Sequence, residues 1–208
     1  MQGTKIKLTY AKRIIRHKWF VFQECMKLGI PWRGITHDMS KFSRAEFGHY
    51  MRRFTVPRLT GVPVRPQALA EFEGAWHHHY CKNDHHWNYW LHAGEPRWTV
   101  TEKGPGEPGF LACDGVDTCV REDTSSIFSN NNEIEDIKNA LNSTPKPLPM
   151  PTNAALEMVA DWRAMSREFG NDAREWYVAA RSAGRVILHP DTARLVEKIL
   201  GIHILCKP

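Results

Sequence analysis

The sequence lacks the apolar segments that would carry it into or across a membrane. No run approaches the about 20 apolar residues of a membrane span, and residues 1–19 hold no apolar stretch of signal-peptide length. The five cysteines are scattered and odd in number, which argues against a disulfide framework and is typical of a reducing compartment. Cys113 and Cys119 fit no standard zinc-knuckle spacing, so free thiols are expected. These absences predict a cytoplasmic protein with no membrane partner.

Long alternating segments, internal repeats and heptad arrays are also missing from the 208 residues, which argues against a β-rich fold, a solenoid or a coiled coil. Acidic residues are outnumbered, and the formal net charge is +5. A basic excess of this size suits a small acidic ligand such as a nucleotide and is compatible with weak nucleic-acid contact. It is also ordinary for a protein with no such ligand.

Helical periodicity dominates what is present. Apolar spacing, together with Gly and Pro at the expected ends, predicts an all-α fold. A capping box of Ser43 and Glu46 would open the third helix, and residues 57–66 are expected to form a loop. The predicted helices cover residues 7–28, 32–42, 45–54, 67–81, 85–93, 153–169, 173–183 and 191–200.

Residues 97–151 differ in composition from the rest of the chain, being rich in Gly, Pro, Ser, Thr and Asn. They are interpreted as an insertion or lid with one short helix near 132–142, and a plain disordered linker is the alternative. Residues 1–96 and 152–208 are then expected to fold together as one helical domain.

The sequence is unusually rich in histidine and tryptophan, with eleven and eight residues. Five of the histidines fall within residues 77–86. Two pairs in this segment lie seven residues apart, which on one straight helix is about 10 Å. A chain break at Asn83 and Asp84 would fold one pair back toward the other. The pairs are His78 with His85 and His79 with His86.

Tryptophans flank this segment, so part of it is expected to be buried, and buried imidazoles need partners for their ring nitrogens. The segment therefore predicts a metal site or a phosphate-binding pocket. A cluster of neutral imidazoles at the surface is the alternative.

Three further residues or pairs carry metal-binding chemistry. His17 lies in the apolar stripe of the first helix, and Asp161 shares a face with Met158 and Met165. Each could instead be an ordinary residue, His17 hydrogen-bonded in the core and Asp161 turned to water or paired with an arginine. The adjacent His37 and Asp38 would project about 100° apart from a helix and still reach one ion over its edge. Imidazole with carboxylate suits Zn²⁺, Fe, Mn²⁺ or Co²⁺.

In chain order these residues read H, HD, HH, HH and D, all in predicted helices. This order resembles the HD-domain metal-dependent phosphohydrolase superfamily. The resemblance implies a helical bundle in which one metal is bound by His17, His37, Asp38 and Asp161. It also implies a second metal held by histidines drawn from His78, His79, His85 and His86.

The string HDMSK at residues 37–41 resembles the HDxGK motif of the HD-GYP branch, with Ser40 in place of Gly. That resemblance implies that Lys41 contacts a substrate phosphate. The chain departs from the branch because NDHHWNYW stands where the loop motif would fall, and because the insertion lengthens the gap before Asp161.

Four strings, HKWFVF, GIPWRGITHDMSKFSRAEF, HHWNYW and EMVADW, are similar to a family of small, His-rich, uncharacterised proteins found mostly in phages and bacteria. This resemblance implies a phage or prophage origin, and hence the cytoplasm of a host cell. It implies no activity.

The function expected from these residues is hydrolysis of a small phosphorylated substrate, a nucleotide or another phosphate ester, by water that one or two divalent ions of Mn, Fe, Co or Zn activate. The expected catalytic residues are Lys41, Asp38 and His79, and the expected substrate-binding residues are Lys41, Arg33 and Arg44. Two alternatives remain open. One is a di-iron oxygenase on the same fold, and the other is a zinc-stabilised, non-catalytic protein that binds nucleic acid or a host factor.

Overall fold

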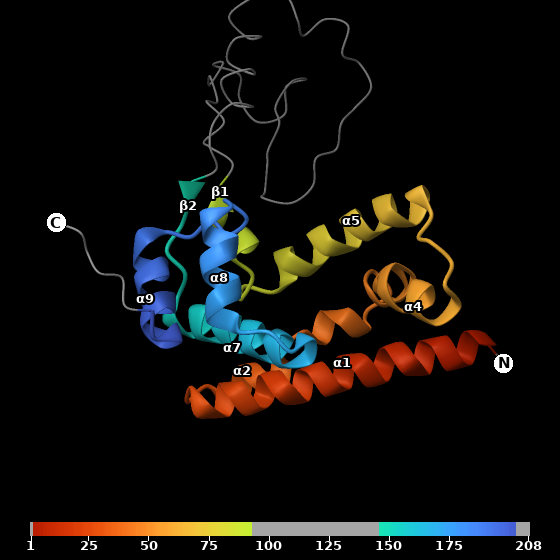
Figure 1. The fold of residues 1–208 in the computed structure, drawn as a ribbon, viewed down its shortest axis with the longest axis horizontal. Coiled ribbons are helices and arrows are strands. Elements are labelled where there is room, and N and C mark those ends of the chain that lie inside the picture. Colours follow the sequence, from red (N-terminus) through yellow and green to blue (C-terminus); the bar gives the residue numbers. More distant parts are fainter. Residues whose placement is uncertain (1, 93–145, 203–208) are drawn as a thin grey trace, which may run out of the picture. The chain divides into compact units, whose positions relative to one another are not determined.

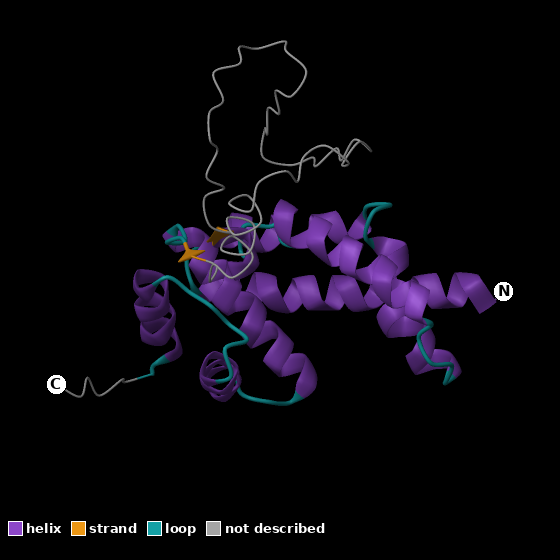
Figure 2. Ribbon diagram, turned by 90° about the horizontal axis from the view of Figure 1, so that it is seen from above, coloured by secondary structure: helices purple, strands orange, loops and turns teal. Residues whose placement is uncertain are grey.

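The computed structural model describes residues 2–92 and 146–202, and helices predominate in them (Figures 1 and 2). The α-helices are α1 (Gln2–Lys27), α2 (Pro31–Thr36), α3 (Phe47–Tyr50), α4 (Val56–Thr60), α5 (Pro66–Lys82), α7 (Thr152–Phe169), α8 (Ala173–Ser182) and α9 (Pro190–Leu200). The shorter elements are the 3₁₀ turns η1 (Met39–Phe42) and η3 (Trp87–Trp90), the π-helical turn η2 (Met51–Thr55), and the paired strands β1 (Leu91–His92) and β2 (Lys146–Pro147). The all-α fold class is confirmed for this part of the chain.

The chain divides into two compact units, one of residues 1–91 with 147–208 and one of residues 92–146. Most of the second unit, with the expected helix near 132–142 and the cysteines Cys113 and Cys119, lies outside the described residues. Composition predicts that residues 147–151 belong to the insertion, but the structure places them in the first unit. Met150 is buried in its core.

Helix α1 forms because apolar side chains recur along one face at helical spacing. Tyr10, Ile14, Val21 and Cys25 are all buried, and His17 lies in the same stripe with 6% exposure. This face packs against α2 and α7 (Figure 1). The contact with α7 is close because Ala160 and Ala164 on that helix are small and fully buried against it.

Helix α2 docks on α1 through a glycine. A Cβ added to Gly34 would lie 2.8 Å from the Cα of Phe22 and 2.9 Å from the Cβ of Cys25, so a hydrogen is all that fits there. Pro31 opens α2, where its missing N–H is no loss. The position of the turn that follows α2 therefore depends on Gly34.

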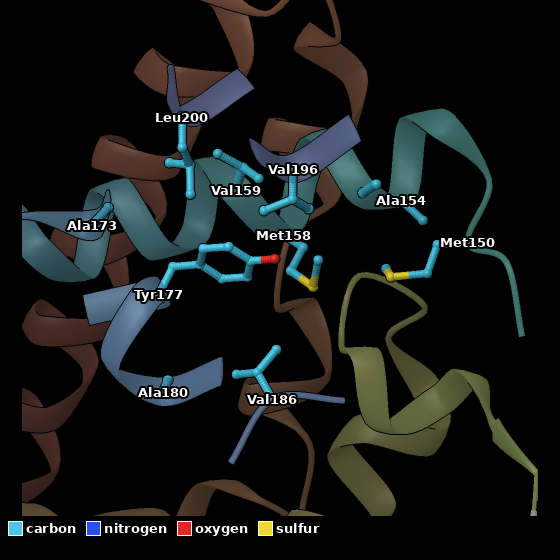
Figure 3. Packing of buried hydrophobic residues seen from close by; sticks show 11 residues of the cluster. Met150, Ala154, Met158, Val159, Ala173, Tyr177, Ala180, Val186, Val196 and Leu200 are labelled. Carbon is cyan, nitrogen blue, oxygen red and sulfur yellow. The ribbon is translucent and has the colours of Figure 1, made fainter. Parts of the chain in front are cut away.

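The main core lies among α7, α8 and α9. In Figure 3, Tyr177 of α8 points toward Met158 of α7, with Val196 of α9 close by. Glycines in the left-handed conformation end α7 and α9 at Gly170 and Gly201. This core fixes α7, which leaves one face of that helix for the polar residues described below.

Four local predictions are wrong. Ser43 and Glu46 form no capping box, because Glu46 is fully buried and its carboxylate binds histidines. Residues 57–60 of the expected loop belong to the helix α4, since Pro57 lies in its first turn, where no N–H is needed. The expected helix over 85–93 is only the turn η3, and that over 32–42 breaks after Thr36.

Among the helices of residues 2–92 and 146–202, none combines the length and the apolar character that crossing a bilayer requires.

A larger residue at position 34 should loosen the packing of α2 on α1. We expect Gly34→Ala to lower the free energy of unfolding by about 1–3 kcal/mol, because backbone rather than a movable side chain opposes the new methyl group. Chemical denaturation measures this. Gly74→Ala is the matched control, since nothing lies within 4 Å of a Cβ there, and alanine at a helical position gains up to about 1 kcal/mol. Equal stability of the two variants would contradict the close approach.

Candidate metal centre

The His37 and Asp38 pair lies in a turn and not, as the sequence predicted, in a helix. Helix α2 ends at Thr36, and Asp38 has φ 54° and ψ 26°, a left-handed conformation that costs a residue other than glycine about 1–3 kcal/mol. The ammonium of Lys18 on α1 donates to the backbone carbonyls of Ile35, at 3.2 Å, and of His37. Lys18 thus ties the turn to α1.

The turn brings His37 against residues from two distant helices. The Nε2 atom of His17 on α1 lies 3.0 Å from Oδ1 of Asp161 on α7. Nε2 of His37 lies 3.8 Å from the same oxygen and 3.3 Å from Oδ2 of Asp38. The structure thus brings together the four residues of the HD-like pattern, and three of them, His17, His37 and Asp161, form a group that could hold a metal ion.

A second group of donors lies on the other side of the Asp38 carboxylate. Its Oδ1 lies 3.2 Å from Nε2 of His79 and 3.5 Å from Nε2 of His85. Nε2 of His86 lies 2.9 Å from Nε2 of His79. The four ligand atoms lie within 4.8 Å of one another and could also hold an ion. Asp38 is therefore positioned to serve both groups, with one oxygen toward each.

Several of these atoms are buried with no hydrogen-bond partner, although buried polar groups normally have one. The contact between His17 and Asp161 is short, but its angles are not those of a hydrogen bond. Separations of 3.0–3.8 Å are those expected between neighbouring ligands that each lie about 2.0–2.2 Å from one ion. The residues therefore fit a metal. The unpartnered atoms in the two groups are both ring nitrogens of His17, Nε2 of His37 and His85, Oδ1 of Asp38 and Oδ1 of Asp161.

Two buried glutamates orient the imidazoles. Glu157 accepts a hydrogen bond from Nδ1 of His37 at 2.8 Å, and the same carboxylate oxygen lies 3.1 Å from Nδ1 of His85. Glu46 accepts one from Nδ1 of His79 at 2.8 Å. With Nδ1 protonated, each ring presents the Nε2 lone pair to the centre, as the outer partners of metal-bound histidines commonly ensure.

Sequence reasoning missed both glutamates. Glu157 stands one helical turn before Asp161 on a largely apolar face, which was the available signal, because a carboxylate there needs a buried partner. Glu46 sits at a capping-box position, and that local pattern concealed its distant partner.

The expected substrate-binding cations have different surroundings. Lys41 forms an ion pair with Oδ2 of Asp38 and lies 5.7 Å from the ring centre of Tyr50. Arg33 forms ion pairs with Glu157 and Asp84, so its charge stabilises the Glu157 carboxylate that contacts the ligand histidines. Arg44 is exposed. His78 binds Glu46 from outside and joins neither group of ligands.

Burial and charge act in opposite directions on these groups. Burial disfavours protonated His37, but the nearby carboxylates of Asp38, Glu157 and Asp161 outweigh it and raise the pKa of His37 to about 9. For His86, burial comes first and the neighbouring His85 and His79 add to it, so its pKa is well below the usual range. Without metal, the centre therefore holds a proton on His37 and a neutral ring at His86.

A cavity of about 450 Å³ adjoins both groups, because its wall includes Asp161 from one and His86 from the other. Four tryptophans, Trp76, Trp87, Trp162 and Trp176, form much of the remaining wall. Among the described residues that line it, none is a lysine or an arginine. The cavity suits a ligand with a flat, apolar part that reaches the metal-binding groups with its polar end.

Comparison with known proteins gives a family but no activity. A family model described as a family of unknown function (DUF5662) matches residues 7–107 and 126–202. No curated protein and no solved structure matches the chain.

Metal content should follow the two groups of ligands. We expect Asp38→Ala to abolish metal binding, because Asp38 faces both groups, and His79→Ala to remove about one ion per chain. Elemental analysis of purified protein measures this. His78→Ala is the matched control, since the neighbouring His78 faces outward, and it should retain the wild-type content. Equal losses in the His78 and His79 variants would overturn the assignment of ligands.

Metal uptake should release a proton. The metal-free pKa of His37 is raised from 6.5 to about 9, so the proton stabilises the metal-free fold fully below about pH 6.5, and this stabilisation is lost as the pH rises through about 9. A metal must displace that proton, so metal affinity should increase across the same range. Calorimetric titrations at pH 7.5 in buffers with different ionisation enthalpies count the protons. An uptake that releases none at this pH would contradict the protonation of His37.

Proposed function

We propose that this chain, which belongs to the DUF5662 family of unknown function, is a metal-dependent phosphohydrolase. Its substrate would be a nucleotide or a related phosphate ester. The observation that carries the proposal is the shared Asp38 carboxylate, with a group of nitrogen and oxygen donors on each side and a cavity that reaches both. Such an arrangement suits two ions a few ångströms apart, as in many phosphoesterases.

The ligands of one ion would be His17, His37, Asp38 and Asp161, and those of the other Asp38, His79, His85 and His86. Divalent ions at these positions would supply Lewis-acid activation of water and would offset the charge of a phosphate. Mn, Fe, Co and Zn are the candidate metals, because the donors are imidazole nitrogens and carboxylate oxygens.

Residues of the chain would have the remaining roles, which are to offset charge and to orient the ligands. Lys41 forms an ion pair with Asp38 and does not line the cavity, so its charge would act on a bound phosphate through the shared carboxylate and not by direct contact. Glu157 and Glu46 hold the ligand rings, and Arg33 holds Glu157. His79 is fully buried between Glu46 and Asp38, so it suits the role of ligand better than that of proton donor.

The tryptophan-lined cavity favours a substrate with a base or another flat ring. Since no lysine or arginine occurs among its described lining residues, the cavity favours an ester with one phosphate over a polyphosphate, whose extra charge would lack a partner. A nucleoside monophosphate has the required flat ring and single phosphate.

A second candidate is an oxygenase with two irons. The nitrogen-rich donors of the Asp38, His79, His85 and His86 group and the apolar cavity favour it. Paired iron with a visible absorption band in the purified protein would support the oxygenase, and Mn, Co or Zn would support the hydrolase. A purely structural zinc site is favoured less, because His86 and Asp161 border a cavity, whereas structural zinc sites are closed.

A phosphate-release assay tests the proposal. The metal-loaded chain should hydrolyse at least one member of a panel of nucleoside monophosphates, cyclic nucleotides and aryl phosphates. We expect Lys41→Ala to lower kcat/KM by about 10- to 100-fold, because the shared carboxylate loses one charge-assisted hydrogen bond, the one from Lys41 to Asp38. The exposed Lys198→Ala on α9 is the control and should match the wild type. The proposal fails if no phosphate is released from the panel while His37→Ala keeps its full metal content.

A further inference from the structure

A second cavity, of about 400 Å³, lies between α1 and the stretch formed by η2 and α4, and it holds none of the metal-binding residues. Figure 1 shows α4 beside the N-terminal half of α1. The wall includes four cations, Lys12, Arg13 and Arg16 from α1 and Arg58 from α4, together with the hydroxyl-bearing Thr9 and Thr55.

The charge of this wall is not balanced within the described residues. Arg16 contacts Glu168 at 3.4 Å, but no described carboxylate pairs with Lys12, Arg13 or Arg58. The segments that form the wall contain few acidic residues that could pair with these cations. Helix α1 contains one, Glu24 near its far end, and residues 47–65 contain none. Like charges held at one cavity repel one another, and an anion removes that repulsion.

The cations form a row that extends past the cavity. Lys5, Lys12 and Arg16, with Thr9 between the first two, follow intervals of three and four residues, so they share one face of α1. From Lys5 to Arg16 the row spans about 16 Å of helix, more than a single phosphate group occupies. A chain of phosphates suits it better than one anion.

The opposite wall offers a surface for a base. Phe54 is 39% exposed in the cavity wall, and the guanidinium of Arg53 lies 5.3 Å from its ring centre. The π-helical turn Met51–Thr55 places both Phe54 and Thr55 there, and such turns are frequent at functional sites. Exposed aromatic rings beside rows of cations are typical of sites that bind single-stranded nucleic acid.

We propose that this cavity and the adjoining face of α1 bind a single-stranded nucleic acid, with phosphates along the cation row and a base against Phe54. The inference is independent of the metal centre, because it uses other residues and needs no reaction.

Fluorescence anisotropy with a labelled 15-nucleotide single strand tests the inference on the full chain. We expect Arg13→Glu combined with Arg58→Glu to weaken binding at least 10-fold. The dependence of log affinity on log salt should become shallower by about 1.4, because each phosphate contact in a single strand contributes about 0.7. The matched control is Arg185→Glu combined with Lys198→Glu, two exposed cations outside the cavity. It has the same net charge and should bind far more tightly than the cavity variant.

Further arms identify the ligand and guard against misfolding. Lys12→Glu, an exposed change on α1, should weaken binding several-fold and leave the unfolding temperature unchanged. This single variant keeps the inference testable if the double variant does not fold. Phe54→Ala should weaken binding of the single-stranded nucleic acid but should not weaken binding of inorganic triphosphate. Equal losses in the cavity and control variants would overturn the inference. So would binding of ATP as tight as that of the strand, or displacement of the strand by polyglutamate at equal charge, which would indicate an acidic protein partner.

Discussion

The carboxylate of Asp38 is the constraint on which the rest of the centre depends. It is 1% exposed, adopts a left-handed backbone conformation, and faces one set of imidazoles with each oxygen. A buried carboxylate in a strained turn is costly on two counts, so the surroundings must hold it there. Lys41 pairs with its Oδ2 atom, Lys18 fixes the carbonyls of the turn, and Gly34 lets the preceding helix lie close enough to α1.

Hydrophobic packing sets where the ligands meet. The contact of Val21 and Cys25 with Ala160 and Ala164 brings α1 close to α7, and this contact lies one turn from His17 on α1. Because Asp161 directly follows Ala160, the same contact brings it to His17. The core of α7, α8 and α9 fixes α7 from its other side. Small apolar side chains therefore determine the spacing of polar atoms that are distant in sequence.

The sequence was sufficient to predict most of the helices and the candidate ligands. It was insufficient to predict the residues that surround those ligands. Helix ends at Gly29 and Gly170 follow from local backbone preferences, and the α1 stripe and α7 emerge from periodicity. The ligand candidates stood out by residue type. Glu46 could not be found, because a capping pattern explained it locally and its histidine partners are more than thirty residues away. The turn at Asp38 could not be predicted either, since its left-handed conformation depends on contacts with α1 rather than on neighbouring residues.

The charges of the described centre are consistent with a site that could hold divalent ions. Four carboxylates, Asp38, Glu46, Glu157 and Asp161, lie within the centre, and two cations, Arg33 and Lys41, pair with them directly. Neutral histidines contribute ring nitrogens but no charge, and Arg33 also pairs with Asp84, so at least two negative charges remain at high pH. One divalent ion would neutralise two of these charges. The cations outside the centre do not enter this balance, because Lys12, Arg13 and Arg58 line a different cavity. These surface cations and the buried carboxylates are therefore separate features, and of the two only the buried groups could hold a metal ion.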